Sequence, residues 1–372
     1  MICRDFAGRD CSLLGFGTMR FPKTKEGKID EPEAERMLDA AYAAGVNYFD
    51  TAYPYHEGDS EPFVGRALSK YPRESYAIAT KLPLWVVDSA EAAVEMFEKQ
   101  LARLGTDYVD YYLFHALNKG SWRDKVLGYG LIPIFEKLCK EGKIRHLGFS
   151  FHDKYEVFEE IATYRKWDFC QIQYNYFDTI DGPGQRGYDL ATRLGIPIVI
   201  MEPIRGGNLI QLSDEIKGYL AEIDPSRSLA DFALSWVASQ KNVSVVLSGM
   251  STMEQLDQNL KTLGSEFRPL SEKELAEVVG VADRIRASVY NNCTGCRYCM
   301  PCPAGVDIPR AFSLLNQSGM FPPQIESYRR RYLSKPESLA SLCVSCGACE
   351  EKCPQQIGIR EDLRRAVDVF EG

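Results

Sequence analysis

Residues 30–51, DEPEAERMLDAAYAAGVNYFDT, contain one complete helix-and-strand unit. Asp30, followed three residues later by Glu33, has the pattern of a capping box and so marks the start of a helix. Gly45 ends that helix, because glycine readily adopts the left-handed conformation found after helix ends. The next residues, 46–51, read as a short strand. This alternation of helix and strand is typical of chains built from parallel βαβ units.

The same alternation runs through the first part of the chain up to residue 287. Eight such units fit a (β/α)₈ TIM barrel better than a doubly wound sheet. No G-x-G-x-x-G motif follows the first strand, which further weakens a Rossmann interpretation. We expect the segment before Leu14 to form a hairpin that closes the barrel floor. The expected strands are residues 14–18, 46–51, 76–82, 109–115, 144–150, 169–174, 197–202 and 243–248.

Length and composition set the broad class of the protein. A chain of 372 residues can form one large and one small domain. We predict a barrel over 1–287 and a smaller, mainly helical domain over 288–372, with expected helices at 308–317 and 326–333. Hydrophobic residues make up 45% and charged residues 26%, as in globular proteins, and the apolar stretches are too short to cross a membrane. The net charge of -8 argues against a nucleic-acid partner.

Two cysteine runs distinguish the smaller domain, NCTGCRYCMPCP (292–303) and SLCVSCGACEEKCP (341–354). Each run ends in Cys-Pro, with the spacing of bacterial ferredoxins, in which the last cysteine of each run binds the other run's cluster. A compact Cys-x-x-Cys-x-x-Cys loop can turn three thiolates onto one cubane, and the fourth arrives from a distant segment. We therefore predict two [4Fe–4S] clusters. The ligands would be Cys293, Cys296, Cys299 and Cys353 for the first cluster, and Cys343, Cys346, Cys349 and Cys302 for the second.

Disulfides and zinc are the alternative interpretations of these cysteines. Disulfides are disfavoured because the chain starts without a signal peptide and otherwise reads as a cytoplasmic protein, which is the location we expect. Zinc sites usually show two separated Cys-x-x-Cys pairs rather than unbroken runs of four. Iron–sulfur clusters are the favoured interpretation.

Candidate catalytic residues stand where the predicted strands end, which is where barrel enzymes place their chemistry. Asp50, Lys81 and His115 end the second, third and fourth strands, and Tyr55 follows in the next loop. This set suits carbonyl reduction, with Tyr55 as proton donor. A phenol with a pKa near ~10 is a weak acid, so we expect a nearby Lys81 ammonium to lower that pKa, with Asp50 keeping the lysine charged. His115 would orient the carbonyl oxygen.

Each of these four side chains has a structural alternative. Asp50 could cap a turn, Lys81 and His115 could form an ion pair, and Tyr55 could be a surface aromatic residue. Most polar residues at strand ends are structural when considered singly. The four together, at consecutive strand ends, favour the catalytic interpretation.

These residues lie in segments that resemble the aldo/keto reductase family, and the resemblance extends over residues 1–285. It implies a (β/α)₈ barrel, reduction of a small-molecule carbonyl substrate by NADPH or NADH, and a catalytic tetrad of Asp50, Tyr55, Lys81 and His115. The cysteine runs narrow it to the branch with a C-terminal [4Fe–4S] ferredoxin-like domain. The segments are LGFGTMR (14–20), FDTAYPYHEGDSE (49–61), ATKL (79–82), VDYYLFHA (109–116) and GKIRHLGFS (142–150).

The resemblance also implies a set of cofactor contacts. Gly17, Thr18 and Met19 match the segment against the nicotinamide ribose. Ser150 and Gln171 match residues that hold the carboxamide. The remaining matched positions are Asp50, Met201, Pro203, Arg205, Gly206, Gly207, Gln255 and Asn259, which include the pyrophosphate loop and the adenine side.

Three positions depart from the family pattern. Phe151 replaces an asparagine, and Met201 replaces the aromatic residue that stacks under nicotinamide. Gly249 and Gln255 stand where basic residues often bind a 2′-phosphate, although a phosphate favours Arg or Lys. Another basic residue, such as Arg205, could bind the 2′-phosphate in their place. The choice between NADPH and NADH therefore stays open.

The two domains differ in how they move electrons. A nicotinamide passes two electrons as hydride, whereas a [4Fe–4S] cluster passes one at a time, so a flavin or a radical-tolerant substrate would have to join them. One hypothesis is an oxidoreductase in which barrel and clusters exchange electrons. A second is an ordinary reductase whose clusters are structural or dock an electron-transfer protein. A third is a nicotinamide-binding redox sensor or partner subunit. The tetrad favours an active oxidoreductase.

Overall fold

The computed structural model describes residues 1–372, and the chain divides into two compact units. The first comprises Met1–Pro203 and Asp231–Ser271, and the second comprises Ile204–Ala230 and Glu272–Gly372. The second unit therefore takes a segment from the middle of the chain as well as its end. Each unit has its own core.

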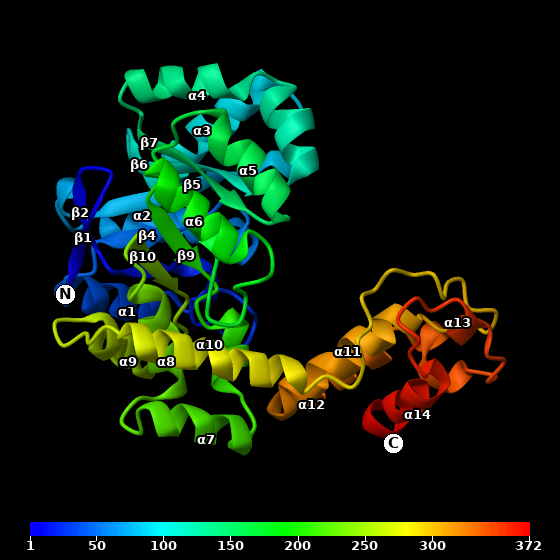
Figure 1. Ribbon diagram of the computed structural model, residues 1–372. Coiled ribbons are helices and arrows are strands. Elements are labelled where there is room, and N and C mark those ends of the chain that lie inside the picture. The colour runs from blue at the N-terminus through cyan, green and yellow to red at the C-terminus, as the bar shows by residue number, and fades with distance from the viewer. The chain divides into compact units, whose positions relative to one another are not determined.

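The first unit is a closed barrel of eight parallel strands, as predicted (Figure 1). Each strand pairs with its neighbour in the sequence, and β10 returns to pair with β3. Buried parallel strands appear in sequence as short apolar runs, which is why they could be recognised. The strands are β3 (Leu14–Gly17), β4 (Tyr48–Asp50), β5 (Ala77–Leu82), β6 (Val109–Leu117), β7 (Ile144–Phe151), β8 (Phe169–Gln173), β9 (Ile198–Met201) and β10 (Val243–Ser248).

Helices follow the barrel strands along the chain. Helix α1 begins where predicted, because the Asp30 side chain accepts a hydrogen bond from the backbone N–H of Glu33 at 3.3 Å. The capping box is only half formed, since the Glu33 carboxylate pairs with Arg36 instead of reaching back. Gly45, with φ of 92°, follows the helix end. The helices are α1 (Glu31–Ala43), α2 (Ser60–Leu68), α3 (Ala90–Leu104), α4 (Leu131–Lys140), α5 (Tyr155–Tyr164), α6 (Gly184–Leu194), α8 (Leu229–Ala238) and α9 (Met253–Leu263).

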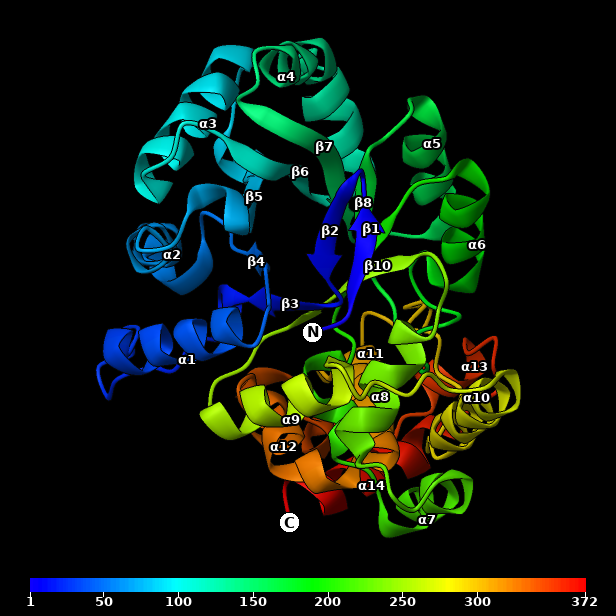
Figure 2. The same ribbon diagram turned by 90° about the vertical axis from the view of Figure 1, so that its left-hand side faces the viewer.

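An antiparallel hairpin covers the end of the barrel that faces the viewer in Figure 2. It consists of β1 (Cys3–Phe6) and β2 (Arg9–Ser12). Phe6 is fully buried among side chains of the barrel strands, and its ring stacks on that of Tyr111 with centroids 4.3 Å apart. The expected hairpin at the barrel floor is thus present, and it leaves the opposite, C-terminal strand ends for the site.

The second unit is helical. Its C-terminal helices share an apolar core in which the rings of Tyr332 and Phe370 stack with centroids 4.8 Å apart. The helices predicted at 308–317 and 326–333 are both present. The helices of this unit are α7 (Asp214–Ile223), α10 (Glu272–Ala287), α11 (Ile308–Met320), α12 (Ile325–Leu333), α13 (Ala348–Glu351) and α14 (Ile359–Phe370).

The middle segment of the chain is tied to this second unit by side-chain contacts. The guanidinium carbon of Arg284 lies 4.0 Å from the centre of the Tyr219 ring. Gln324 donates a hydrogen bond to the side-chain oxygen of Asn208 at 2.5 Å. Helix α10 and residues 204–230 therefore group with the C-terminal helices, whereas the sequence boundary at 287/288 remains a prediction.

No helix in the chain has both the length and the apolar character that a membrane span requires.

Candidate active site and cluster sites

The four predicted catalytic residues come together at the C-terminal ends of adjacent strands. Asp50 is the last residue of β4, Lys81 lies near the end of β5, and His115 lies in β6. Tyr55 begins the short helical turn η2 (Tyr55–Gly58), which follows β4. Because β4, β5 and β6 pair in register, their ends converge on one mouth of the barrel.

Lys81 is held by a buried ion pair. Its Nζ donates to both carboxylate oxygens of Asp50, at 2.7 and 2.8 Å, and to the carbonyl oxygen of Thr51 at 2.8 Å. Burial lowers the pKa of Lys81, but the negative charge of Asp50, with hydrogen bonding to Asp50 and Tyr55, outweighs this effect and leaves that pKa above its ordinary value. Lys81 is therefore an ammonium at neutral pH.

Tyr55 lies beside this ammonium. The Nζ of Lys81 is 5.1 Å from the centre of the Tyr55 ring. Burial raises the pKa of Tyr55, and the charge of Lys81 opposes that rise without cancelling it. The net direction is opposite to the lowering we expected, because the phenol is more deeply enclosed than the sequence reveals. Tyr55 consequently keeps its proton at neutral pH.

His115 is a neutral imidazole. Burial, with the charges of Lys81 and His152, brings its pKa well below the ordinary value. Its Nδ1 is buried and has no hydrogen-bond partner in the protein. The His115 ring meets that of Tyr55 edge-on, with centroids 6.4 Å apart, and lies 5.0 Å from the ring of Trp85. A neutral imidazole here can donate one hydrogen bond toward the cavity without introducing a charge.

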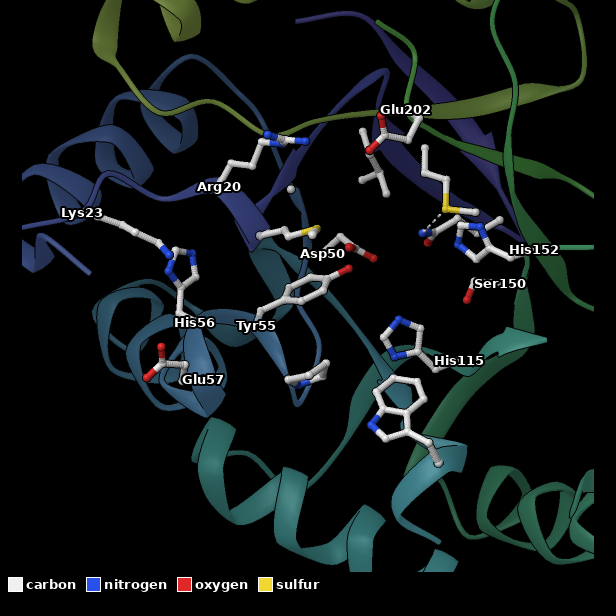
Figure 3. Close-up of a pocket in the computed structure, with 18 of the residues that line it drawn as sticks. Arg20, Lys23, Asp50, Tyr55, His56, Glu57, His115, Ser150, His152 and Glu202 are labelled. Atoms are coloured by element: carbon white, nitrogen blue, oxygen red, sulfur yellow. Dashed lines mark hydrogen bonds between the residues drawn. The ribbon is translucent and has the colours of Figure 1, made fainter. Parts of the chain in front are cut away.

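Asp50, Tyr55 and His115 line a cavity of about 610 Å³ (Figure 3). Its wall includes six of the residues expected to bind the cofactor: Gly17, Met19, Asp50, Ser150, Gln171 and Met201. Gln171 donates through Nε2 to the sulfur of Met201 at 3.6 Å, while its Oε1 is buried without a partner. An unpaired buried acceptor is costly unless a ligand supplies a donor. A carboxamide N–H₂ would supply one, so this wall fits a nicotinamide.

The predicted ligand cysteines line two separate cavities in the second unit. One contains Cys293, Cys296, Cys299 and Cys353, and the other contains Cys302, Cys343, Cys346 and Cys349, with Cys299 also at its edge. All these thiols are free of disulfides. Four thiolates around each cavity are the donor set that a [4Fe–4S] cluster takes, so the cysteines of each cavity fit such a cluster.

Comparison with known proteins shows the family. Residues 13–283 match the model of the Aldo/keto reductase family. The chain belongs to the aldo/keto reductase family. Residues 292–357 match the model of a 4Fe-4S dicluster domain, so this aldo/keto reductase carries a C-terminal ferredoxin-like domain, as the resemblance implied.

Several known proteins are similar to this aldo/keto reductase. The uncharacterized oxidoreductase YqkF of Bacillus subtilis is 29% identical over 296 residues, covering 72% of this chain and 91% of the relative. The NADH-specific methylglyoxal reductase of Escherichia coli is 25% identical over 316 residues, covering 72% and 95%. The holo form of the aldo-keto reductase AKR11C1 from Bacillus halodurans has a TM-score of 0.64 and 27% identity, covering 76% of this chain and 96% of that structure.

Some residues expected to bind the cofactor in this aldo/keto reductase do not line the cavity. Thr18 is buried, with its hydroxyl 2.8 Å from that of Ser60. Gln255 accepts a hydrogen bond from the N–H of Ser251 at the start of α9, and Asn259 donates to Ser248 at 2.8 Å.

Pro203 is the last residue of the first of the two segments that form the barrel unit. Arg205, Gly206 and Gly207 belong to the second unit, where the Arg205 guanidinium lies 5.5 Å from the centre of the Phe321 ring. The contacts of all these residues with a cofactor stay predictions.

The cavity also contains side chains that we did not predict. His152 and Glu202 face it from the ends of β7 and β9, and Glu202 has a positive φ of 55°. Burial lowers the pKa of His152, and the charge of Glu202 opposes that shift. His152 is two residues from the predicted contact Ser150, and Glu202 directly follows the predicted contact Met201. Their positions just after strand ends could therefore have indicated from the sequence that they face the cavity. Arg20, Lys23, Lys28, His56, Glu57 and Trp85 also belong to the lining.

Proposed function

We propose that this aldo/keto reductase reduces a small carbonyl compound with hydride from NADPH or NADH, with Tyr55 as the proton donor. The observation that carries the proposal is the position of Tyr55 in the cavity wall, with the Nζ of Lys81 5.1 Å from the centre of its ring. The similar protein named as a methylglyoxal reductase supports a small carbonyl substrate.

The proposed cofactor site lies on the wall formed by Ser150 and Gln171. Ser150 Oγ accepts from the N–H of Ala116 at 2.7 Å, which leaves its own proton free to donate. Gln171 offers its unpaired oxygen as an acceptor. Together they match the donor and acceptor groups of a carboxamide. When bound, the nicotinamide supplies the hydride.

The roles of the protein groups follow from their protonation. The neutral His115 donates a hydrogen bond to the carbonyl oxygen and orients it toward Tyr55. As the carbonyl carbon gains hydride, the C–O π bond breaks, and the oxygen takes the proton from the Tyr55 hydroxyl. An alcohol forms, and the phenolate left behind is stabilised by the Lys81 ammonium until solvent returns a proton. General acids in such positions typically contribute ~10²–10⁴-fold in rate.

The test is Tyr55→Phe, with Tyr53→Phe as the matched control in the same loop. Tyr53 is outside the cavity lining, and its hydroxyl accepts from Lys99 at 3.2 Å. We expect Tyr55→Phe to lower kcat for reduction of a panel of aldehydes by about 10²–10⁴-fold, without weakening nucleotide binding. The control should retain wild-type rates. Equal rates for Tyr55→Phe and wild type would refute the proposal.

We further propose that the eight cysteines hold two [4Fe–4S] clusters, which exchange electrons with the barrel through a flavin or a radical state of the substrate. The measurement is iron, sulfide and flavin content of protein purified without oxygen, followed by visible spectra after NADPH or NADH is added. About eight irons per chain and bleaching on addition support this route. Iron without bleaching would show that electrons from the nucleotide do not reach the clusters, and it would refute this route.

A second candidate is a redox sensor or electron-transfer subunit that docks a partner protein. Tyr298 and Val344 each stand between two predicted ligands, with 66% and 69% of their surface exposed. Exposed apolar side chains beside clusters suit docking of an electron-transfer protein. Tight nucleotide binding with no aldehyde turnover would favour this candidate over the reductase.

A further inference from the structure

Basic side chains gather on one rim of the active-site cavity. The rim is the segment 20–29, in which a backbone bridge pairs Lys23 with Ile29 and the turn between them contains Gly27. Arg20, Lys23 and Lys28 from this segment all line the cavity. The chain as a whole carries a net charge of -8, so this local excess of positive charge runs against its composition.

Arg20 lies directly on Gly249, which follows β10. A Cβ atom added to Gly249 would lie 3.1 Å from both Cγ and Cδ of Arg20 and 3.2 Å from its Cβ. The stem of the arginine thus occupies the space that any larger residue at position 249 would need. The hydroxyl of Ser251 donates to the carbonyl oxygen of Arg20 at 2.7 Å, which fixes the arginine backbone against the same segment.

The guanidinium of Arg20 makes no hydrogen bond or ion pair with the protein. Lys28, by contrast, is paired, because its Nζ lies 3.5 Å from a carboxylate oxygen of Asp59 and 3.8 Å from one of Glu57. Lys23 is also without an acidic partner, and its charge adds to burial in lowering the pKa of His56. Figure 3 shows Arg20 and Lys23 on the same side of the cavity. Two unpaired cations at a cavity mouth attract an anion, and a guanidinium fork matches the oxygens of a phosphate.

We propose that Arg20 binds a phosphate group of the nicotinamide dinucleotide and takes the place of the basic residue that is absent at Gly249. This inference rests on the proposed function and assigns a residue to cofactor recognition within it. The phosphate is either the pyrophosphate, which NADPH and NADH share, or the 2′-phosphate, which NADPH alone carries. Arg20 reaches it from the segment after β3, with its stem supported by Gly249.

The experiment measures dissociation constants of NADPH and NADH for the full chain, kept without oxygen, in wild type, Arg20→Gln and Lys25→Gln. Lys25 is an exposed lysine on the same segment that does not line the cavity, so it controls for the loss of one charge. We expect Arg20→Gln to weaken binding by about 10- to 100-fold, as for a lost hydrogen bond to a charged group. Lys25→Gln should change it by less than about twofold.

The two nucleotides distinguish the phosphates. If Arg20→Gln weakens the binding of NADPH alone, Arg20 binds the 2′-phosphate. If it weakens the binding of both nucleotides equally, Arg20 binds the pyrophosphate. Gly249→Ala provides a second variant, because its methyl group pushes the arginine stem aside by a few tenths of an ångström. It should weaken binding of the same nucleotide as Arg20→Gln, but to a smaller extent.

Unchanged affinities in Arg20→Gln, with wild type binding normally, would overturn this inference and leave the proposed function standing. A wild-type protein that binds neither nucleotide would overturn both.

Discussion

The Nζ of Lys81 sits within 2.8 Å of both carboxylate oxygens of Asp50, and both side chains are buried at the barrel mouth. Removing one partner of such a pair leaves an uncompensated buried charge. The pair holds the lysine beside Tyr55, so its geometry bears on both stability and chemistry.

We predict that Asp50→Asn lowers the free energy of unfolding by about 3–5 kcal/mol, because Lys81 loses its counter-charge inside the protein. Denaturant unfolding checks this. The matched control is Glu98→Gln, which breaks the more exposed pair of Glu98 and Lys143 and should cost about 0–1 kcal/mol. If the two variants lost comparable unfolding free energy, the burial of the Asp50–Lys81 pair would not explain the cost of breaking it.

Reduction should be nearly independent of pH around neutrality. Tyr55 must be protonated to act, and its pKa is raised, so the reaction is lost only above about pH 10. His115 must be neutral, and its pKa is lowered, so the acid limb from this group lies below about pH 6.5. A profile of kcat/KM between these limits should be flat. A limb near pH 8 would show that another group controls the proton transfer.

The crossed ligand assignment predicts paired losses of iron. Cys302→Ser and Cys346→Ser should each remove the same cluster, about four irons per chain, because both cysteines line one cavity. Iron analysis and spectra of the reduced clusters test this. The double variant should lose no more iron than either single variant. Loss of all iron in the double variant alone would show that the two cysteines serve different clusters.

Trp85 should contact the carbonyl substrate rather than the cofactor. It lies in the turn η4 (Leu84–Val86), has 53% of its surface exposed, and faces His115 across 5.0 Å. We predict that Trp85→Ala raises KM for aromatic aldehydes severalfold, a loss of about 1 kcal/mol of ring contact. Nucleotide dissociation constants should stay unchanged. A shift in those constants instead would place Trp85 against the cofactor.

The hairpin residue Phe6 should contribute strongly to barrel stability. Phe6→Ala would leave a cavity among the inward-facing side chains and should cost about 3–5 kcal/mol in unfolding free energy. Ile180→Ala is the control, since Ile180 is 73% exposed and should change stability by less than about 0.5 kcal/mol. A small effect at Phe6 would mean that the hairpin contributes little to barrel stability.

The barrel and the grouping of the tetrad could be predicted from sequence because both depend on order along the chain. Parallel barrel strands are short apolar runs, and their last residues meet at one rim. Asp50, Lys81 and His115 were therefore recognisable by position. The same reasoning recovered the two cysteine groups, since ligand spacing is local within each run.

Features that depend on packing between distant segments could not be predicted in this way. The pKa of Tyr55 is set by how deeply the phenol is enclosed, which a strand pattern does not reveal. Arg20 belongs to a motif that was recognised, yet its place over Gly249 depends on the closure of the barrel by β10. The grouping of α10 with residues 204–230 likewise depends on a side-chain contact, that of Arg284 with Tyr219.

The hydrogen bond between Gln324 and Asn208 limits how the chain can be divided into fragments for experiments. A gene shortened after residue 287 would encode the whole barrel and keep α10 against the segment 204–230, but it would remove Gln324 and Phe321, which contact Asn208 and Arg205 of that segment. The remaining C-terminal piece would in turn lose Asn208 and its neighbours. Each fragment would therefore contain only part of the second unit. Point substitutions in the intact polypeptide are therefore the sound way to assign roles to the barrel and the clusters.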